Sequence, residues 1–362
     1  MQDSLVLAAR RWGAAAPRHS CVPARVLWHY AQPMPLHVLE TVRDANSAWN
    51  LPASYLEALR ERFPGVRFTS AALGAETEAL LPDADVVLGW GVNAKNFASA
   101  RTLKWVHVTA AGVGSLLFPA MVESDVTITN SRGLHADAMA EHTLGVMLSF
   151  VRQLHLCRDA QREHRWSQDE MWALMPELGP LKGSTMVLVG LGAVGGAISA
   201  RARALGVHVV GVRRRPDASD TRADEQYGID ELPRLLPRAD WLVLAAPLTA
   251  GTRHLVGAAE LALLKRSAVV INVGRGHLID EPALVAALQE RRITGAGLDV
   301  VEVEPLPKTS PLWDLPNVLL TPHTSGVAPD YWSRAMAIFA DNLQRCIDGR
   351  PLNNVVDKRE GY

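Results

Sequence analysis

The feature that most limits the fold of this chain is a glycine-rich turn between an apolar run and a helical pattern. Residues 186–189 predict a buried strand, and the next six residues read Gly-Leu-Gly-Ala-Val-Gly, a GxGxxG pattern that opens a helix. In such a unit the first glycine allows the tight turn, the second lets the backbone approach a pyrophosphate, and the third lets helix and strand pack closely. The N-terminus of the helix adds free N–H groups and a positive dipole end. This context favours dinucleotide binding over a purely structural glycine turn. The residues expected to cradle the dinucleotide are Gly190, Gly192, Ala193, Val194 and Gly195.

Further short apolar runs on both sides of this motif predict an α/β protein. Runs that are apolar throughout, rather than alternating, are typical of parallel strands covered by helices on both faces. The expected strands are 25–29, 86–88, 105–108, 186–189, 208–212, 241–245, 269–273, 296–298 and 318–320. Helices are expected at 53–62 and 329–348. Between the two series, the spacing predicts one long helix over 136–162 and then a loop over 163–182.

Length and composition indicate two globular domains and exclude several classes of protein. The chain has 362 residues, which suggests about two domains. Its 37 basic and 38 acidic residues give a net charge of −1, which attracts neither nucleic acid nor an anionic membrane. No apolar run predicts a transmembrane helix. Three distant cysteines, Cys21, Cys157 and Cys346, fit neither a disulfide framework nor a metal site, which favours a cytoplasmic protein. No apolar segment follows Arg10 and Arg11, so residues 1–25 are interpreted as a frayed extension or an upstream start rather than a targeting signal.

A run of three arginines indicates which dinucleotide this chain prefers. In NAD-binding units the end of the second strand usually presents an acid to the ribose 2′-hydroxyl. Here that position carries Arg213, Arg214 and Arg215. Guanidinium groups suit a 2′-phosphate, because they combine a positive charge with a planar fork of donors. We therefore expect NADP(H) to be favoured, with NAD(H) possible and a solvated basic turn as the alternative.

Three motifs at predicted strand ends supply candidate catalytic groups: Arg275, Glu304 and His323. The carboxyl ends of parallel strands meet at one edge of a sheet, so these side chains can converge on one bound cofactor. An arginine can anchor a substrate carboxylate and polarise the carbonyl. A histidine can give or take a proton, and a glutamate bonded to it favours the charged imidazole and holds its orientation. Taken singly, each residue could equally be an ordinary surface or loop residue.

Together, the motifs at 190–195, 272–276, 297–305 and 310–323 resemble those of the D-isomer-specific 2-hydroxyacid dehydrogenases, a family that includes glyoxylate/hydroxypyruvate reductases. The resemblance implies two Rossmann-like, doubly wound parallel-sheet domains with a cleft between them. It also implies a discontinuous substrate domain of residues 1–127 and 324–362, and a dinucleotide-binding domain of residues 128–323. Homodimers are usual in such a family.

The resemblance also assigns roles to individual positions. It places Arg275, Glu304 and His323 in the catalytic set. The backbone N–H groups of Gly91 and Val92 would bind the substrate carboxylate beside Arg275. Further cofactor contacts are expected from Pro247, Thr252, Val273, Gly274 and Asp299. The chain departs from the family at Gly114, where many members have an aspartate, and at Trp90, which either narrows the pocket or packs in the core.

These observations predict an NADP-preferring dehydrogenase that acts on a small D-2-hydroxy acid or 2-keto acid and binds no metal. The favoured reaction is the reduction of glyoxylate or hydroxypyruvate. Two alternatives stay open: a nucleotide-sensing regulatory protein of the same fold, and a dehydrogenase for bulkier 2-keto acids. A hydrolase with bound NAD would need a lysine and further acids near the nicotinamide, and formate oxidation is disfavoured because Glu304 is an acid where that branch has glutamine.

Overall fold

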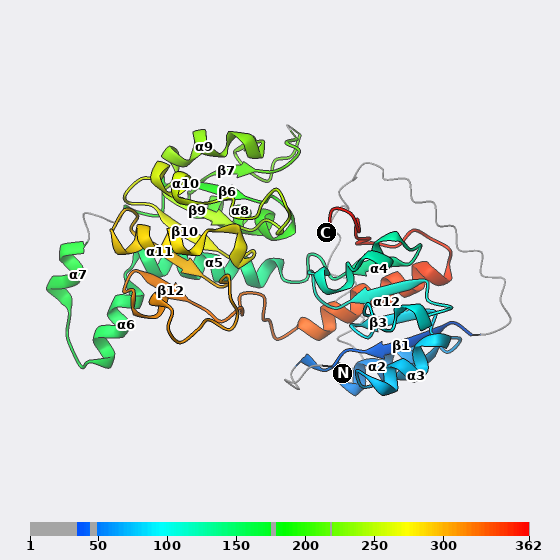
Figure 1. Ribbon diagram of the computed structural model, residues 1–362. Coiled ribbons are helices and arrows are strands. Elements are labelled where there is room, and N and C mark those ends of the chain that lie inside the picture. The colour runs from blue at the N-terminus through cyan, green and yellow to red at the C-terminus, as the bar shows by residue number, and fades with distance from the viewer. Residues whose placement is uncertain (1–34, 44–48, 175–178, 218, 362) are drawn as a thin grey trace. The chain divides into compact units, whose positions relative to one another are not determined.

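The computed structural model describes residues 35–43, 49–174, 179–217 and 219–361 (Figure 1). These residues form two compact units. One takes the residues up to Leu134 together with those from Pro329 onward, and the other is His135–Ala328. The sequence predicted the domain boundaries between residues 127 and 128 and between residues 323 and 324. The expected strand at 25–29, Cys21 and the N-terminal segment lie outside the described residues.

The first unit is built on a five-stranded sheet in the order β2-β1-β3-β4-β5, and all of its pairings are parallel. The strands are β1 (His37–Thr41), β2 (Arg67–Ser70), β3 (Val86–Gly89), β4 (Trp105–Val108) and β5 (Thr127–Asn130). Alternate strand residues face two separate cores. Val38 and Trp105 belong to the core that includes residues of α2 (Ala53–Arg62) and α12 (Tyr331–Ile347). The other core, on the opposite face, includes a residue of α4 (Pro119–Glu123). The short helix α3 (Ala75–Leu80) leads toward β3.

The second unit contains a seven-stranded parallel sheet in the order β12-β11-β10-β9-β6-β7-β8. Its strands are β6 (Thr185–Val189), β7 (His208–Val212), β8 (Glu225–Tyr227), β9 (Trp241–Leu244), β10 (Val269–Asn272), β11 (Gly295–Leu298) and β12 (Val318–Leu320). The chain runs outward from β6 in one direction and then outward from β9 in the other. The β6/β9 boundary is therefore the switch point at which ligands of such sheets bind, outside the carboxyl ends of the strands.

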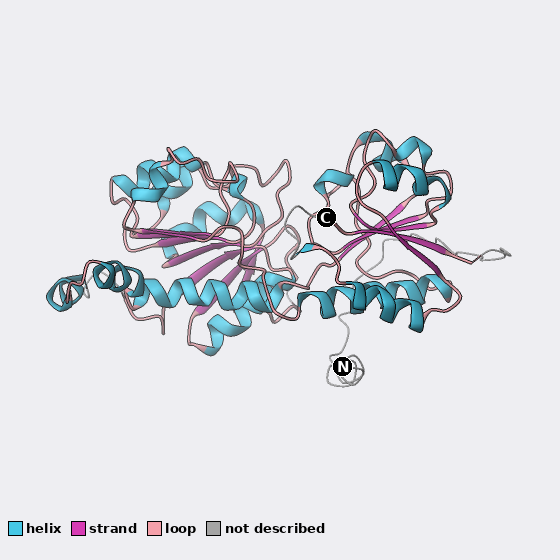
Figure 2. Ribbon diagram, turned by 90° about the horizontal axis from the view of Figure 1, so that it is seen from below, coloured by secondary structure: helices cyan, strands magenta, loops and turns pink. Residues whose placement is uncertain are grey.

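Helices cover both faces of this sheet, which is why its central strands are apolar on both sides (Figure 2). One face packs against α5 (Ala136–Val151) and α8 (Ala193–Ala204). The other packs against α9 (Leu232–Leu235), α10 (Ala258–Leu263) and α11 (Glu281–Gln289). Two helices, α6 (Leu154–Arg162) and α7 (Gln168–Leu174), extend beyond the sheet at the end of α5 (Figure 1). The predicted α/β class with two parallel sheets is confirmed.

Two expectations about residues 136–182, at the start of the second unit, were wrong. The single helix expected over 136–162 is two helices, because Gln153 adopts a left-handed conformation with φ 56° between α5 and α6. The segment expected to be a loop over 163–182 contains α7. Strands β1, β2, β5 and β8 were not predicted, because charged and hydroxyl side chains interrupt their apolar pattern. The short sequences of β2 and β8, RFTS and EQY, show this most clearly.

Candidate functional site

The glycine turn after β6 has the geometry of a dinucleotide cradle. Gly190 has φ +98°, and a Cβ there would lie 2.7 Å from the backbone of Ala245. A Cβ on Gly195 would lie 1.8 Å from the carbonyl oxygen of Gly190, so only glycine permits this approach of helix and turn. Gly192 precedes α8 without a side-chain cap, and a Cβ there would meet nothing within 4 Å. The open space above Gly192 and the uncapped N–H groups of α8 fit the pyrophosphate of a dinucleotide.

The three arginines that follow β7 are not all presented to solvent in the same way. Arg214 and Arg215 are exposed. Arg213 instead makes an ion pair with Asp220, with Nη1 2.6 Å from Oδ2. Asp220 also binds Arg222, a residue that the sequence analysis missed because it stands in a polar loop with no strand-end pattern. The charge near this turn is therefore partly neutralised by the protein itself.

The loop after β9 is closed by its own hydrogen bonds. The hydroxyl of Thr252 donates to the carbonyl oxygen of Pro247 at 2.8 Å and accepts the backbone N–H of Thr249 at 2.8 Å. A Cβ on Gly274 would lie 2.8 Å from the carbonyl oxygen of Ala246, so the turn after β10 lies against this loop. Val273 donates its N–H to the carbonyl oxygen of Leu244 at 3.1 Å. The loops after β9 and β10 therefore pack against each other at the carboxyl edge of the sheet.

The turn after β10 presents Arg275 at the carboxyl edge of the sheet. Asn272 holds this turn from inside: its side-chain amide donates to the carbonyl oxygen of Arg275 at 2.9 Å, and its oxygen accepts the N–H of Gly274 at 3.0 Å. The Arg275 side chain is exposed, with Nη1 2.6 Å from the carbonyl oxygen of Gly274. A Cβ on Gly276 would stand 2.0 Å from the backbone of Val301. The arginine turn is therefore packed tightly on the loop that follows β11.

The loops after β11 and β12 bring Glu304 and His323 together. Nδ1 of His323 and Oε2 of Glu304 are 2.7 Å apart, and both side chains are partly exposed to solvent. His323 has φ 55°, and its N–H donates to the carbonyl oxygen of Asp299 at 2.8 Å. Because the glutamate engages Nδ1, Nε2 is the ring nitrogen that can face a substrate. A carboxylate bonded to an imidazole in this way fixes the orientation of the ring.

Asp299, at the end of β11, ties these loops to the sheet. Its buried carboxylate accepts the hydroxyl of Thr321 at 2.7 Å and the backbone N–H groups of Thr324 and Ser325 at 2.8 and 3.1 Å. Burial alone would raise the pKa of Asp299, but these hydrogen bonds outweigh it and lower the pKa. Asp299 is thus an ionised anchor for the segment that carries His323.

A second carboxylate of the same loop, Glu302, was also missed from the sequence. Its Oε1 lies 2.8 Å from Nε2 of His254, and its N–H donates to Oε2 of Glu281 at 2.9 Å. Because His254 belongs to the loop after β9 and Glu281 follows the arginine turn, Glu302 links the loops of three adjacent strands. The only sequence feature that could have indicated Glu302 is its position two residues before Glu304.

The loop expected to bind the substrate lies in the first unit. Contrary to expectation, the N–H of Gly91 is used internally, because it donates to the hydroxyl of Thr41 at 2.9 Å. Val92 is buried, and Trp90 packs against the same core. Gly114 begins a short 3-10 turn, and a Cβ there would meet nothing within 4 Å.

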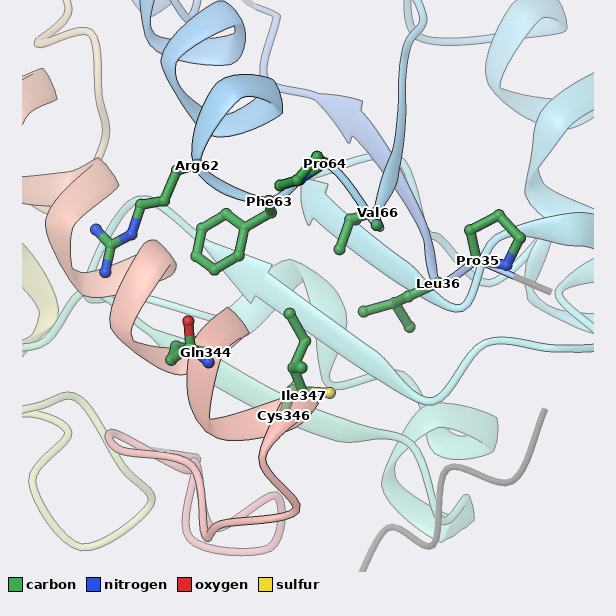
Figure 3. Close-up of a pocket in the computed structure, with 10 residues that line it drawn as sticks. Pro35, Leu36, Arg62, Phe63, Pro64, Val66, Gln344, Cys346 and Ile347 are labelled. Atoms are coloured by element: carbon green, nitrogen blue, oxygen red, sulfur yellow. The ribbon is translucent and has the colours of Figure 1, made fainter. Parts of the chain in front are cut away.

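A hollow of about 370 Å³ in the first unit lies elsewhere (Figure 3). Leu36 and Val66, which line it, stand immediately before β1 and β2, so it opens at the amino ends of the strands. Ligands of parallel sheets bind at the opposite ends. Burial raises the pKa of Cys346, which also lines the hollow, to about 11, so its thiol stays protonated at neutral pH. This hollow is therefore not the candidate site.

The described residues include neither a membrane-spanning helix nor a metal-binding cluster. None of their helices has the length and apolar character needed to cross a bilayer. No group of three His, Cys, Asp or Glu side chains within this part of the chain is arranged to hold a metal ion. The described cysteines, Cys157 and Cys346, are both free thiols.

Sequence comparison agrees with this geometry. Residues 144–325 match the NAD binding domain of the D-isomer specific 2-hydroxyacid dehydrogenases. A D-3-phosphoglycerate dehydrogenase of Methanocaldococcus jannaschii is 32% identical over 292 residues, 79% of this chain, but the match spans only 55% of that longer protein. A glyoxylate reductase of Korarchaeum cryptofilum is 31% identical over 273 residues, 74% of this chain and 80% of that protein.

Solved structures show the same likeness. A D-isomer specific 2-hydroxyacid dehydrogenase of Xanthobacter autotrophicus Py2, in complex with NADPH and MES, is 32% identical and superposes with a TM-score of 0.76 over 91% of this chain and 100% of that one. An NADPH-dependent glyoxylate/hydroxypyruvate reductase of Sinorhizobium meliloti, in complex with NADP and sulfate, is 29% identical with a TM-score of 0.74 over 90% and 100%. With the glycine cradle and the strand-end loops of the seven-stranded sheet, these matches show that the chain belongs to the D-isomer specific 2-hydroxyacid dehydrogenase family.

Proposed function

We propose that this protein is an NADP-preferring reductase of small 2-keto acids, with glyoxylate or hydroxypyruvate as its substrate. The observation that carries the proposal is the 2.7 Å pair of His323 and Glu304 at the carboxyl edge of the sheet that holds the glycine cradle. The names of the Korarchaeum cryptofilum and Sinorhizobium meliloti relatives support this substrate class.

The roles of the catalytic residues follow from their chemistry. The nicotinamide ring, when bound, supplies the hydride. Nε2 of His323 donates a proton to the carbonyl oxygen during reduction and takes it back during oxidation. Glu304 holds the imidazole through Nδ1 and so keeps Nε2 directed toward the substrate. Arg275, exposed at the same sheet edge, binds the substrate carboxylate through its planar fork of N–H groups.

We further assign the cofactor to the second unit and the substrate loop to the first. Gly190, Gly192 and Gly195 form the pyrophosphate cradle, with the first turn of α8 at Ala193 and Val194. The remaining cofactor contacts proposed are Pro247, Thr252, Val273, Gly274 and Asp299. Val92 remains the proposed substrate contact in the first unit. Residues 1–127 and 324–362 are the proposed substrate domain.

The preference for NADP(H) is supported by the arginines after β7. NADPH and NADP are the cofactors named in the Xanthobacter autotrophicus and Sinorhizobium meliloti structures. In this chain Arg213 directly follows β7, at the position where an NAD enzyme usually has an acid. Arg214 and Arg215 add two further exposed guanidiniums.

A homodimer is the proposed assembly. Large apolar side chains stand out on the α6–α7 arm of the second unit, where Trp166 is 90% exposed and Trp172 is 60% exposed. Exposed aromatic side chains in such a group are typical of a contact surface. Sedimentation velocity tests this: two copies are expected at micromolar concentration, and a monomer would contradict the assignment.

The test of the function is a panel of keto acids assayed with NADPH and NADH side by side. We expect NADPH oxidation with glyoxylate and hydroxypyruvate, and lower kcat/KM with bulkier keto acids and with NADH. Cofactor binding without turnover on any keto acid would favour a nucleotide-sensing protein instead. The fastest turnover with a bulky keto acid would change the substrate class but not the reaction.

A further inference from the structure

Three charged side chains form a cluster beside the glycine cradle. Asp220 lies between two arginines, with Oδ2 2.6 Å from Nη1 of Arg213 and Oδ1 2.8 Å from Nε of Arg222. Only 10% of the Asp220 side chain is exposed. The hydrogen bonds from Arg222 are the main reason that the pKa of Asp220 is lowered to about 2. The cluster therefore holds two positive charges and one negative charge at neutral pH.

Arg222 is the member of this cluster that contacts the glycine cradle. Its Nη1 lies 3.4 Å from the carbonyl oxygen of Gly192, and its Cδ would be 3.1 Å from a Cβ on Gly196. Asp220 also accepts the backbone N–H of Arg222 at 3.0 Å, so the carboxylate fixes both the backbone and the side chain. Arg222 is thereby held across the start of α8, and Arg213 is held at the end of β7.

We propose that Arg213 and Arg222 together bind the ribose 2′-phosphate that distinguishes NADPH from NADH, and that Asp220 limits this preference. The inference rests on the proposed function and adds to it a specificity residue outside the predicted arginine run. The end of the second strand beside the glycine turn is where the ribose 2′-position lies in this type of fold. A guanidinium has five N–H donors, and Asp220 engages one nitrogen of Arg213 and two of Arg222, so each fork retains donors for a phosphate. The negative charge of the Asp220 carboxylate also repels a phosphate bound nearby.

Opposite charge changes at neighbouring positions test the proposal. Dissociation constants of the full-length protein for NADPH and NADH are measured by cofactor fluorescence, without any substrate. We expect Arg222→Gln to weaken NADPH binding by about tenfold to a hundredfold, the range for a hydrogen bond between charged groups, with NADH binding unchanged. Asp220→Asn should tighten NADPH binding relative to NADH by about threefold or more, because the repelling charge is removed. Arg222→Lys, which keeps the charge but not the fork, should fall between Arg222→Gln and the natural protein.

Arg203→Gln is the matched control. Arg203 also holds this loop, through Asp224 at 2.9 Å and the carbonyl oxygen of Thr221 at 3.0 Å, but it stands at the far end of α8. Its loss should leave the NADPH/NADH ratio unchanged. Two results would overturn the proposal, because each would mean that the order of the loop rather than its charge sets the cofactor preference. In the first, Arg203→Gln shifts the NADPH/NADH ratio as Arg222→Gln does. In the second, Arg222→Gln and Asp220→Asn shift the ratio in the same direction. NADH binding confirms that each variant is folded. If the natural protein does not turn over any keto acid, only the proposed function is contradicted. The proposal for Arg213 and Arg222 is tested separately, because it depends on cofactor binding measured without substrate.

Discussion

The two sheets of this protein use their polar residues in opposite ways. In the five-stranded sheet, buried polar side chains bond to one another: Nδ1 of His107 lies 2.7 Å from the hydroxyl of Thr129, which also accepts Nε1–H of Trp105 at 2.7 Å. In the seven-stranded sheet the strands that lead to the site are mostly apolar, such as β10 (VVIN) and β12 (VLL), and the chemically active side chains follow their carboxyl ends, as with Arg275 and His323. Polar residues within strands thus stabilise the first unit, whereas polar residues after strands give the second unit its site.

This contrast predicts that the second unit is the more sensitive to small changes at its loops. The largest effect is expected for Gly195→Val. A side chain there collides with the carbonyl oxygen of Gly190, so we expect loss of dinucleotide binding and a decrease of about 2 to 3 kcal/mol in the free energy of unfolding. Cofactor titration and chemical denaturation measure the two effects. Normal binding by this variant would show that the cradle is misassigned.

Glu304→Gln tests the catalytic pair with a smaller expected effect. Glutamine keeps the shape of the side chain but not its charge, so His323 loses its charged hydrogen-bond partner at Nδ1. We expect kcat to decrease by about tenfold to a hundredfold with little change in the Kd of the cofactor. Glu281→Gln, in the neighbouring Glu302 contact, is the control that leaves the His323 pair intact. An unchanged kcat for Glu304→Gln would exclude the pairing from catalysis.

The buried polar network of the first unit should appear in stability rather than in turnover. Burial lowers the pKa of His107 to about 3, whereas an unfolded histidine takes up a proton near pH 6.5. Between these values the unfolded state binds the additional proton, so stability decreases as the pH falls below about 6.5, by up to about 1.4 kcal/mol per pH unit. His107→Asn, which keeps an acceptor for Thr129, should reduce this pH dependence in denaturation measured from pH 7.5 to 5. The exposed His164 provides a control: His164→Asn should leave the slope as it is.

The smallest effect is expected at Gly114, a glycine of the first unit that contrasts with Gly195. A Cβ at Gly114 meets nothing within 4 Å, and its φ is not in the left-handed region, so Gly114→Asp should change the free energy of unfolding by less than about 0.5 kcal/mol. Thermal denaturation decides this. A large destabilisation would mean that the loop of the first unit is as constrained as the cradle of the second.

Much of the second unit could be predicted because its signals are local. The strand of β6 and the glycine spacing after it follow from a few consecutive residues, and the strand-end motifs indicate Glu304 and His323. Other features depend on contacts that no short pattern encodes. The Asp220–Arg222 pair stands in a polar loop, and the Thr41 hydroxyl that takes the N–H of Gly91 is 50 residues away in the chain. Strand β1 was missed because its buried Glu40 reads as a surface residue, although Arg43 neutralises it at 2.7 Å.

The measurement that tests the central claim most directly is the turnover of His323→Ala with NADPH and glyoxylate, with cofactor binding measured on the same sample. If Nε2 of His323 moves the proton, kcat decreases by about two to four orders of magnitude. The Kd for NADPH should stay close to that of the natural protein, because the cradle is formed by the turn at Gly190 and the first turn of α8 at Gly195, not by the loop that carries His323. Near-normal turnover by this variant would contradict the assignment of the site.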